Sequence, residues 1–316
     1  MLWGTVGPAE LLAKSPAGPV AAGGARILSG GIVLAVIALV VSRGSVRSLS
    51  RTAWPPILAA ACATATFQCA FFTSTARTGA AVATALTFGI APVSTGLCER
   101  LVLGTRLTRR WTTGTACAVA GCAVIAVPGG PVHVDGLGLA CGVLAGGCFG
   151  VYTISAKRLI GAGVNMLAAV PATLLIGGAA LTPWTLPVLP ELTAPRSLAL
   201  VAWLGPATVA LAYWLFITGL RNVTAATAGT LSLAEPLVAT ALAIGLLGEH
   251  LSAHVAAGCL LLLGGLTIVS VPWPLPPSAR GLTRNQPPVS SHGPIPSAVP
   301  VPTVMSTGRC TARKEI

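Results

Sequence analysis

Long apolar runs alternate along the chain with short segments that carry charges, prolines and turn residues. Ten runs can be counted, and they cover about residues 2–13, 20–41, 53–73, 79–103, 111–127, 136–156, 164–183, 198–219, 225–247 and 252–271. Most approach the roughly 20 residues that a helix needs to cross the hydrocarbon of a bilayer. They are too long and too uniformly apolar for barrel strands, so they predict an all-α integral membrane protein with ten transmembrane helices.

The first run is shorter than the others. It offers only about a dozen apolar residues before Lys14, which at about 1.5 Å of rise per residue is too short to span a membrane. It has neither the basic leader nor the small-residue cleavage site of a signal peptide. We therefore expect a truncated first helix, whose first half is missing from this sequence; the alternative is a short, tilted or re-entrant helix.

Composition supports a membrane protein. Hydrophobic residues make up 54% of the 316 residues and charged residues only 8%, against about 25% charged residues in soluble domains. The net charge is +12, but the basic residues form short clusters between apolar runs and are not interleaved with aromatic residues. This pattern suits the anionic surface of a lipid bilayer and argues against a nucleic-acid partner.

The basic clusters also predict the topology. If the N-terminus is cytoplasmic, the outer segments hold only Lys14, Arg77 and Arg196. The basic residues of the inner segments are then Arg43, Arg47, Arg51, Arg106, Arg109, Arg110, Lys157, Arg158, Arg221, Arg280 and Arg284. This asymmetry predicts a multi-pass protein of the cell membrane with both termini in the cytoplasm. Residues 273–316 are rich in Pro, Ser, Thr and Gly without a helical period, and we expect them to form a disordered cytoplasmic tail.

Two halves of the chain match each other at an offset of 144 residues (236 − 92). This offset pairs Pro92 with Pro236, and it also pairs the glycines at 104, 114 and 121 with those at 248, 258 and 265. The matches predict two repeats of five helices each, over residues 1–130 and 131–272. Because five is odd, the second copy would enter the membrane upside down, as in secondary transporters whose substrate site lies between inverted repeats.

Four stretches give the chain a family resemblance: "LWGTVGP", "ARILSG", "VYTISAKRL" and "AEPLVATALAIGLLGEHLSAHVAAGCLLLLGG". Together they resemble the EamA family of the drug/metabolite transporter superfamily over about residues 2–271. The resemblance implies ten helices in two inverted halves, and export of an amino acid, a related metabolite or a drug-like molecule rather than uptake. The family usually ends the fourth helix of each half with Gly-Glu; Gly248 and Glu249 keep this pair, whereas Gly104 is followed by Thr105.

Glu235 and Pro236 stand together inside an apolar run. An ionisable group in a spanning helix costs from about 2.5 kcal/mol upward, so it faces a cavity, pairs with a cation or stays protonated. Glu235 is therefore a candidate substrate- or proton-binding residue; the alternative is a structural hydrogen bond between helices. Pro236 and Pro92 lack an N–H, which would free the carbonyls of Ser232 and Phe88 and make each proline a hinge. The alternative for each is a static kink.

Other polar groups inside the runs complete the candidate site. Arg26 is the only cation well inside a run; it would bind a carboxylate or phosphate or pair with Glu235, or else extend to the outer interface. The resemblance adds that the family often has an arginine there. Four further residues are plausible pocket lining as a set, although each alone fits packing or an interface: Gln68, Tyr152, Tyr213 and Trp214. Trp3 fits either packing or pocket lining. Glu99 and Arg100 look like a pair at the inner interface.

The remaining motifs point to packing rather than chemistry. Four glycines spaced four apart, at 138, 142, 146 and 150, make one face of a helix suitable for close contact, either within the chain or in a homodimer. The cysteines show no metal-ligand spacing, and the sequence has no P-loop, GxSxG or HExxH motif. We expect no cofactor, no metal and no enzyme activity.

These patterns favour a secondary transporter that moves a small-molecule substrate by alternating access, with protons as a candidate coupling ion. The rival interpretation is a membrane enzyme or a structural membrane partner without a transport cycle. An enzyme would need a cluster of polar catalytic groups at one membrane face, and the sequence shows none.

Overall fold

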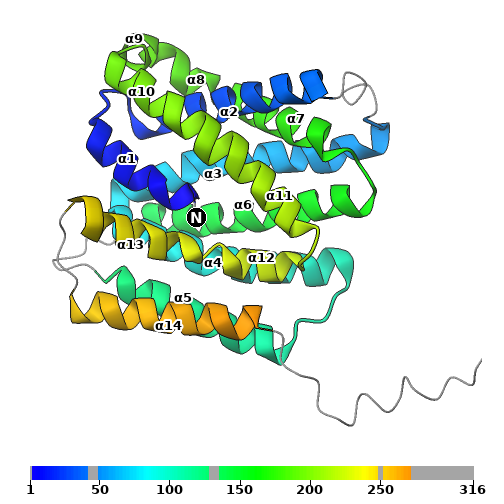
Figure 1. Cartoon of the computed structure of the whole chain (residues 1–316), viewed down its shortest axis with the longest axis vertical. Helices are drawn as coiled ribbons and strands as arrows, with labels where there is room; N and C mark the ends of the chain where they lie inside the picture. The colour runs from blue at the N-terminus through cyan, green and yellow to red at the C-terminus, as the bar shows by residue number, and fades with distance from the viewer. Residues whose placement is uncertain (1, 42–48, 128–134, 248–251, 272–316) are drawn as a thin grey trace, which may run out of the picture. The chain divides into compact units, whose positions relative to one another are not determined.

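The computed structural model of the chain describes residues 2–41, 49–127, 135–247 and 252–271 (Figure 1). The regular elements of these residues are all helical. The first half forms η1 (Leu2–Thr5), α1 (Val6–Ala13), α2 (Pro19–Val41), η3 (Arg51–Ala53), α3 (Trp54–Thr78), α4 (Ala80–Leu103) and α5 (Arg109–Ile125). The second half forms α6 (Gly136–Gly161), α7 (Met166–Ala179), α8 (Thr182–Thr185), η4 (Leu186–Val188), α9 (Leu189–Leu192), α10 (Pro195–Trp203), η5 (Leu204–Leu211), α11 (Ala212–Leu220), α12 (Ala225–Leu231), α13 (Ala234–Leu247) and α14 (Ala253–Ser270).

Seven helical stretches of the described residues are long and apolar enough to cross a membrane. An eighth follows if α7 and the bent segment Thr182–Leu192, which meet at 51°, form one broken span. The prediction of an all-helical membrane protein is therefore confirmed. Each of the ten predicted runs contains helix, but α1 and α5 have only 8 and 17 residues, so the count of ten membrane crossings stays a prediction.

Local sequence signals place the helix ends. Gly79 and Gly104 have φ angles of +85° and +69° where α3 and α4 end, a backbone conformation that favours glycine. The hydroxyl of Thr108 accepts a hydrogen bond from the N–H of Trp111 in the first turn of α5, and the amide oxygen of Asn165 accepts one from the N–H of Leu167 in the first turn of α7. These N-caps satisfy donors that would otherwise be left open.

The glycine face of α6 packs within the chain, mainly against α4. A Cβ at Gly146 would lie 2.6 Å from the Cβ of Ile90, and a Cβ at Gly150 would lie 2.5 Å from the hydroxyl of Ser94. The Ser94 hydroxyl donates a hydrogen bond of 2.7 Å to the carbonyl of Gly146. Of the two roles that the sequence left open for this face, the structure shows the intrachain contact; the homodimer stays a prediction.

A second glycine-lined crossing joins α5 to α14, which lie side by side in Figure 1. A Cβ at Gly265 would lie 2.5 Å from the carbonyl oxygen of Gly114, and one at Gly258 would lie 2.9 Å from that of Gly121. Only glycine permits such a close approach of two backbones.

Two long runs of the second half are interrupted helices. The run predicted at 198–219 forms α10, the π-helical segment η5 and α11. Pro206 lies in η5, and the missing N–H and the bulk of its ring disturb regular α-helical bonding there. The run predicted at 225–247 breaks at Ser232 and Leu233, between α12 and α13.

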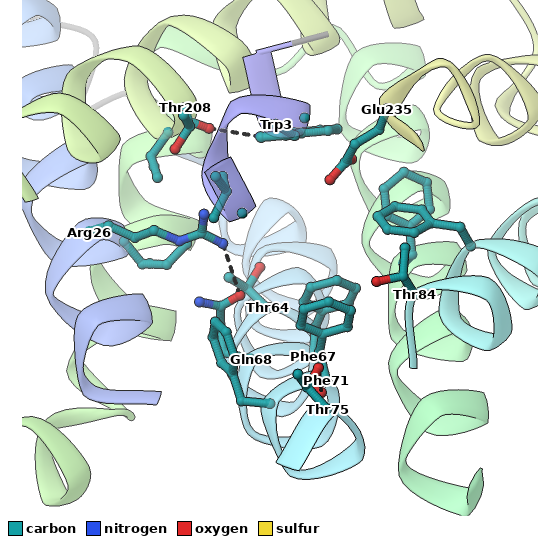
Figure 2. Close-up of a pocket in the computed structure, with 18 of the residues that line it drawn as sticks. Trp3, Arg26, Thr64, Phe67, Gln68, Phe71, Thr75, Thr84, Thr208 and Glu235 are labelled. Carbon is teal, nitrogen blue, oxygen red and sulfur yellow. Dashed lines mark hydrogen bonds between the residues drawn. The ribbon is translucent and has the colours of Figure 1, made fainter. Parts of the chain in front are cut away.

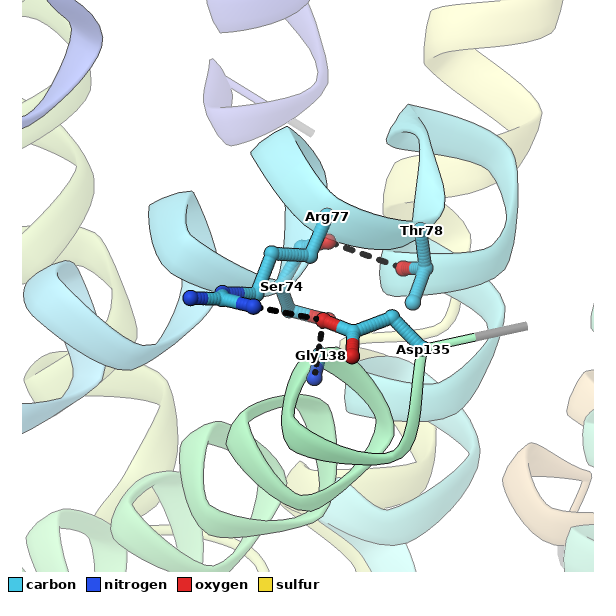
Figure 3. A network of polar contacts seen from close by, with 5 residues as sticks. All are labelled: Ser74, Arg77, Thr78, Asp135 and Gly138. Carbon is cyan, nitrogen blue, oxygen red and sulfur yellow. Dashed lines mark hydrogen bonds and ion pairs between the residues drawn. The ribbon is translucent and has the colours of Figure 1, made fainter. Parts of the chain in front are cut away.

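An exposed ion pair connects the end of α3 to the start of α6 (Figure 3). Arg77 Nη1 lies 3.1 Å from Asp135 Oδ2, and the two side chains are 48% and 26% exposed. Asp135 also caps α6 by accepting the N–H of Gly138 at 3.2 Å. The hydrogen bond from Arg77 holds the pKa of the Asp135 carboxyl below its ordinary value of 3.8.

Replacing Asp135 with Asn is expected to remove a small, acid-sensitive part of the stability. A carboxyl whose pKa is lowered in the folded state contributes stability above its ordinary pKa of 3.8, and this contribution is lost as the pH falls through the lower folded value. Thermal unfolding of detergent-solubilised wild type and Asp135→Asn at stepped pH values measures it. The difference between the two proteins should shrink below pH 3.8; a difference that grows there would contradict this account.

Some predictions fall outside the described residues. They concern Gly248 and Glu249, the basic residues Arg43 and Arg47, and the tail at residues 273–316.

Candidate substrate-binding cavity

A cavity of about 260 Å³ lies among helices of both halves (Figure 2). Its lining residues come from η1, α1, α2, α3, α4, α6, η5, α11 and α13. Segments that are far apart in the sequence thus line one cavity, which is the arrangement expected of a small-molecule site.

Five of the six predicted site residues line this cavity. These residues are Glu235, Arg26, Gln68, Tyr152 and Tyr213. The sixth, Trp214, is not among the lining residues that the structure describes. It follows Tyr213 directly in α11, and its side chain points about 100° away from that of Tyr213 around the helix axis.

Arg26 and Gln68 form the polar centre of the cavity wall. Arg26 Nη2 donates a hydrogen bond of 3.3 Å to Gln68 Oε1, and the Gln68 side chain is only 2% exposed. The other Arg26 nitrogens, Nε and Nη1, and Gln68 Nε2 are buried without a hydrogen-bond partner in the described structure. Unpaired buried donors are costly, and a bound solute or water would satisfy them.

Two carboxyl groups share the cavity with Arg26. Figure 2 shows Glu235 across the space from Arg26, beside Trp3. Glu10 of α1 also lines the cavity, and its buried Oε1 has no hydrogen-bond partner among the described residues. Arg26 interacts electrostatically with both carboxyls, although neither is close enough to form one of the ion pairs seen in the described structure.

The sequence analysis missed Glu10 and left Trp3 open between packing and pocket lining. Glu10 carries the signal that singled out Glu235, an ionisable residue inside an apolar run. Trp3 Nε1 donates a hydrogen bond of 2.7 Å to the carbonyl of Thr208 in η5, and its ring packs at 5.4 Å from that of Tyr213. Contacts between residues so far apart in the sequence cannot be predicted from the local sequence pattern.

Aromatic rings form much of the remaining wall. The Phe67 and Phe71 rings of α3 stack at 5.7 Å, and the Tyr152 and Tyr213 rings meet edge to face at 5.4 Å. Together with Trp3 they give the cavity an apolar surface around three ionisable groups. Such a surface suits a solute that has both an apolar part and charged ends.

The two candidate hinge prolines lie in different settings. Pro92 is buried inside α4, which continues through it as one helix, and it is not among the described lining residues. Pro236 lines the cavity in the first turn of α13, directly after the break. Pro236 cannot donate to the Ser232 carbonyl, but the expectation that this carbonyl is left free is wrong, because the N–H of Glu235 donates to it at 3.0 Å in a tighter turn.

The cavity extends toward one end of the helix bundle. It includes Thr75 near the end of α3 and Ala80 and Thr84 in the first turns of α4. At the other end, side chains pack into one buried cluster that contains Leu159 and Leu220. None of the described residues of α12 lines the cavity.

Glu99 lies at this packed end, and the expectation of an interfacial pair with Arg100 is wrong. The Glu99 side chain is 2% exposed and accepts the N–H of Ala226 in α12 at 2.6 Å, while Arg100 is exposed. Residues 99 and 100 point about 100° apart on the helix, so one faces the bundle and the other faces outward.

Comparison with known proteins places the chain in a family. The model of the EamA-like transporter family matches it twice, over residues 1–127 and 136–271. The chain belongs to the EamA-like transporter family. As a member of this family it is a multi-pass membrane transporter, and the resemblance seen in the sequence is confirmed.

Individual relatives of this EamA-like transporter agree. The chain is 36% identical over 276 residues to a protein named "Uncharacterized transporter YwfM" from Bacillus subtilis (strain 168). The aligned region covers 85% of this chain and 90% of that protein. A crystal structure of another protein matches with a TM-score of 0.71 at 21% identity, covering 85% of this chain and 92% of that one. At this low identity the second match shows a shared fold.

Proposed function

We propose that this EamA-like transporter is a secondary transporter of the cell membrane that exports a small metabolite, an amino acid or a drug-like compound, by alternating access. The observation that carries the proposal is the cavity in which Arg26 and Glu235 face each other across aromatic walls. A zwitterion fits this arrangement, with its carboxylate at Arg26 and its ammonium at Glu235. Proton coupling through Glu235 is part of the proposal.

Two inverted five-helix repeats form the scaffold of the proposed transporter. The helix bounds support them at the offset of 144 residues: α4 moved by 144 would span 224–247, and α12 with α13 spans Ala225–Leu247. Likewise, α5 would move to 253–269, and α14 spans Ala253–Ser270. On this basis the proposed repeats are residues 1–130 and 131–272, followed by a cytoplasmic tail.

The crossing of α5 and α14 supports the inverted relation. The offset exchanges Gly114 with Gly258 and Gly121 with Gly265. In the structure Gly114 meets Gly265 and Gly121 meets Gly258, so the exchange turns one contact into the other. Such a self-complementary contact is what a two-fold relation between two copies produces.

The proposed orientation puts both termini in the cytoplasm, on the basis of the basic segments. In that orientation α4 begins at the outer face, so the cavity extends toward the outside and the packed end around Glu99 faces the cytoplasm. The structure then corresponds to an outward-facing state of the cycle.

Transport by the reconstituted protein tests the proposal. Liposomes that contain the purified protein would be loaded with each member of a panel of amino acids and drug-like compounds, and the exchange of labelled solute would be followed. At least one solute should exchange faster than in protein-free liposomes. Absence of exchange for a broad panel, with correctly inserted protein, would favour the rival membrane enzyme or structural partner.

Replacing Arg26 with Lys is expected to weaken substrate binding in this assay. Lysine keeps the charge but loses the planar donor group, and loss of one charge-assisted hydrogen bond of about 1.5–3 kcal/mol raises the half-saturating concentration roughly tenfold or more. Arg196→Lys is the matched control, because Arg196 is exposed and lies outside the cavity. An unchanged half-saturating concentration in Arg26→Lys would show that Arg26 does not bind the substrate.

A further inference from the structure

Three polar side chains from three helices hold the segment from the end of α11 through α12. Glu99 of α4 accepts the N–H of Ala226 at 2.6 Å. Thr115 of α5 is hydrogen-bonded to Thr230 at 2.7 Å. Lys157 Nζ of α6 donates to the carbonyls of Leu220 and Val223 at 2.7 and 2.6 Å. The segment is thus tied to its neighbours at the packed end of the bundle.

Glu99 and Thr115 are both buried and both come from the opposite half of the chain, and of the three contacts only that of Glu99 is made by a carboxyl group. Its partner, Ala226, belongs to the first turn of α12, whose capping residue Thr224 accepts only the N–H of Thr227. Glu99 therefore satisfies a second open donor of that helix, and its charge is favourable near the helix N-terminus. Separation of α4 from α12 would break this bond.

The two helices are also in close contact next to this bond. A Cβ at Gly229 would lie 2.7 Å from the Thr95 hydroxyl and 3.2 Å from Pro92 Cα. α4 and α12 therefore cross between the cavity and Glu99, and the packed end cannot open while Glu99 holds Ala226.

This tie has no counterpart at the other end of the repeat. The offset of 144 residues takes Glu99 to Ala243 and takes Ala226 back to Val82. The acceptor position of the bond thus becomes Ala243, whose side chain cannot accept a hydrogen bond from the backbone N–H of Val82. In a perfectly symmetric inverted repeat, the outward-facing and inward-facing states would be equivalent. The bond from Ala226 to Glu99 makes them unequal, because it stabilises the state in which the end near Glu99 is closed.

We propose that Glu99 is the positioning residue that keeps the cytoplasmic end of the transporter closed, and that its release from Ala226 is a step of each transport cycle. This inference rests on the proposed function for its orientation and its cycle. It assigns Glu99 no contact with substrate; the residue acts by setting the balance between outward-facing and inward-facing states.

The accessibility of the two ends of the bundle can be measured with two introduced cysteines at positions related by the repeat. Thr84 lines the cavity on the outer side, and 144 residues later Ala228 is buried at the packed end. Thr84→Cys and Ala228→Cys proteins would be treated with a membrane-impermeant maleimide from each side of the membrane. Peptide-resolved mass spectrometry separates these positions from the nine native cysteines.

With Glu99 intact, Cys at 84 should react quickly from outside and Cys at 228 slowly from the cytoplasmic side. Hydrogen bonds to charged groups shift equilibria roughly ten- to a hundredfold, so Glu99→Ala should raise labelling at 228 at least about tenfold. Labelling at 84 should fall at the same time. Glu99→Gln, which keeps an acceptor oxygen but no charge, should give an intermediate value.

Asp135→Asn is the matched control, because Asp135 is also a carboxylate that accepts a helix N-terminal N–H, but at the opposite end. It should leave labelling at 228 unchanged. Equal increases at 84 and 228 in Glu99→Ala would indicate general loosening and overturn the proposal, as would unchanged labelling at 228. Labelling of Cys at 84 only from the cytoplasmic side would instead overturn the proposed orientation, and with it the assignment of Glu99 to the cytoplasmic end.

Discussion

Glu235→Gln is expected to abolish transport driven by a proton gradient and to leave the protein inserted in the membrane. Glutamine has nearly the shape of glutamate but cannot release or take up a proton, so a carboxyl that is protonated and deprotonated in each cycle cannot be replaced by it. Glu235 lines the cavity in the first turn of α13, directly after the helix break. We expect proton-driven flux at the level of protein-free liposomes.

The measurement compares substrate flux with and without an imposed pH gradient over a range of pH values. Glu191→Gln is the matched control, because Glu191 is an exposed carboxylate in α9 that does not line the cavity; its flux should match wild type. Exchange of substrate without a gradient separates binding from coupling, since a binding-competent Glu235→Gln protein still exchanges. Flux of Glu235→Gln equal to wild type at every pH would refute the coupling role.

Gly265→Ala is expected to destabilise the protein far more than Gly264→Ala. A Cβ at Gly265 would meet the backbone nitrogen of Ala118, and it would lie 2.5 Å from the Gly114 carbonyl oxygen and 2.8 Å from Ala118 Cα. Backbone atoms of α5 cannot move aside as a flexible side chain does, so α5 and α14 must separate. Overpacking of this kind costs about 1–3 kcal/mol.

Gly264 gives a matched control on the same helix. No described atom lies within 4 Å of a Cβ placed there, and alanine has a higher helix propensity than glycine by about 1 kcal/mol. Gly264→Ala should therefore be neutral or stabilising. The free energy of unfolding, measured by denaturant titration in detergent, distinguishes the two variants, and equal values would show that α5 and α14 can separate without cost.

The elements that the sequence predicted well are those governed by local rules. The run at 79–103 became α4 at Ala80–Leu103, because its apolar length and Gly104 fix its two ends. The break at Ser232 and Leu233 was predicted less well. Pro236 indicated a disturbance, but the helix already stops before it, where Glu235 N–H bonds to the Ser232 carbonyl.

The candidate site was predicted only where a residue type is unusual for its surroundings. Glu235, Arg26 and Gln68 are polar groups in apolar runs, and such groups face a cavity because lipid excludes them. Trp3 and Phe67 are ordinary residues of a membrane helix, and only the packing of distant segments brings them to the cavity. The contact made by Glu99 could not be predicted from the sequence, since its partner is a backbone N–H on a helix 127 residues away.

The glycine crossing between α5 and α14 has a mechanical consequence. Its backbones touch at two points, Gly114 with Gly265 and Gly121 with Gly258, and the contact is unchanged when the two halves exchange roles. Helices that meet in this way can serve as a fulcrum about which the remainder of each half rocks. The cavity would then open and close away from this contact, while α5 and α14 stay packed against each other.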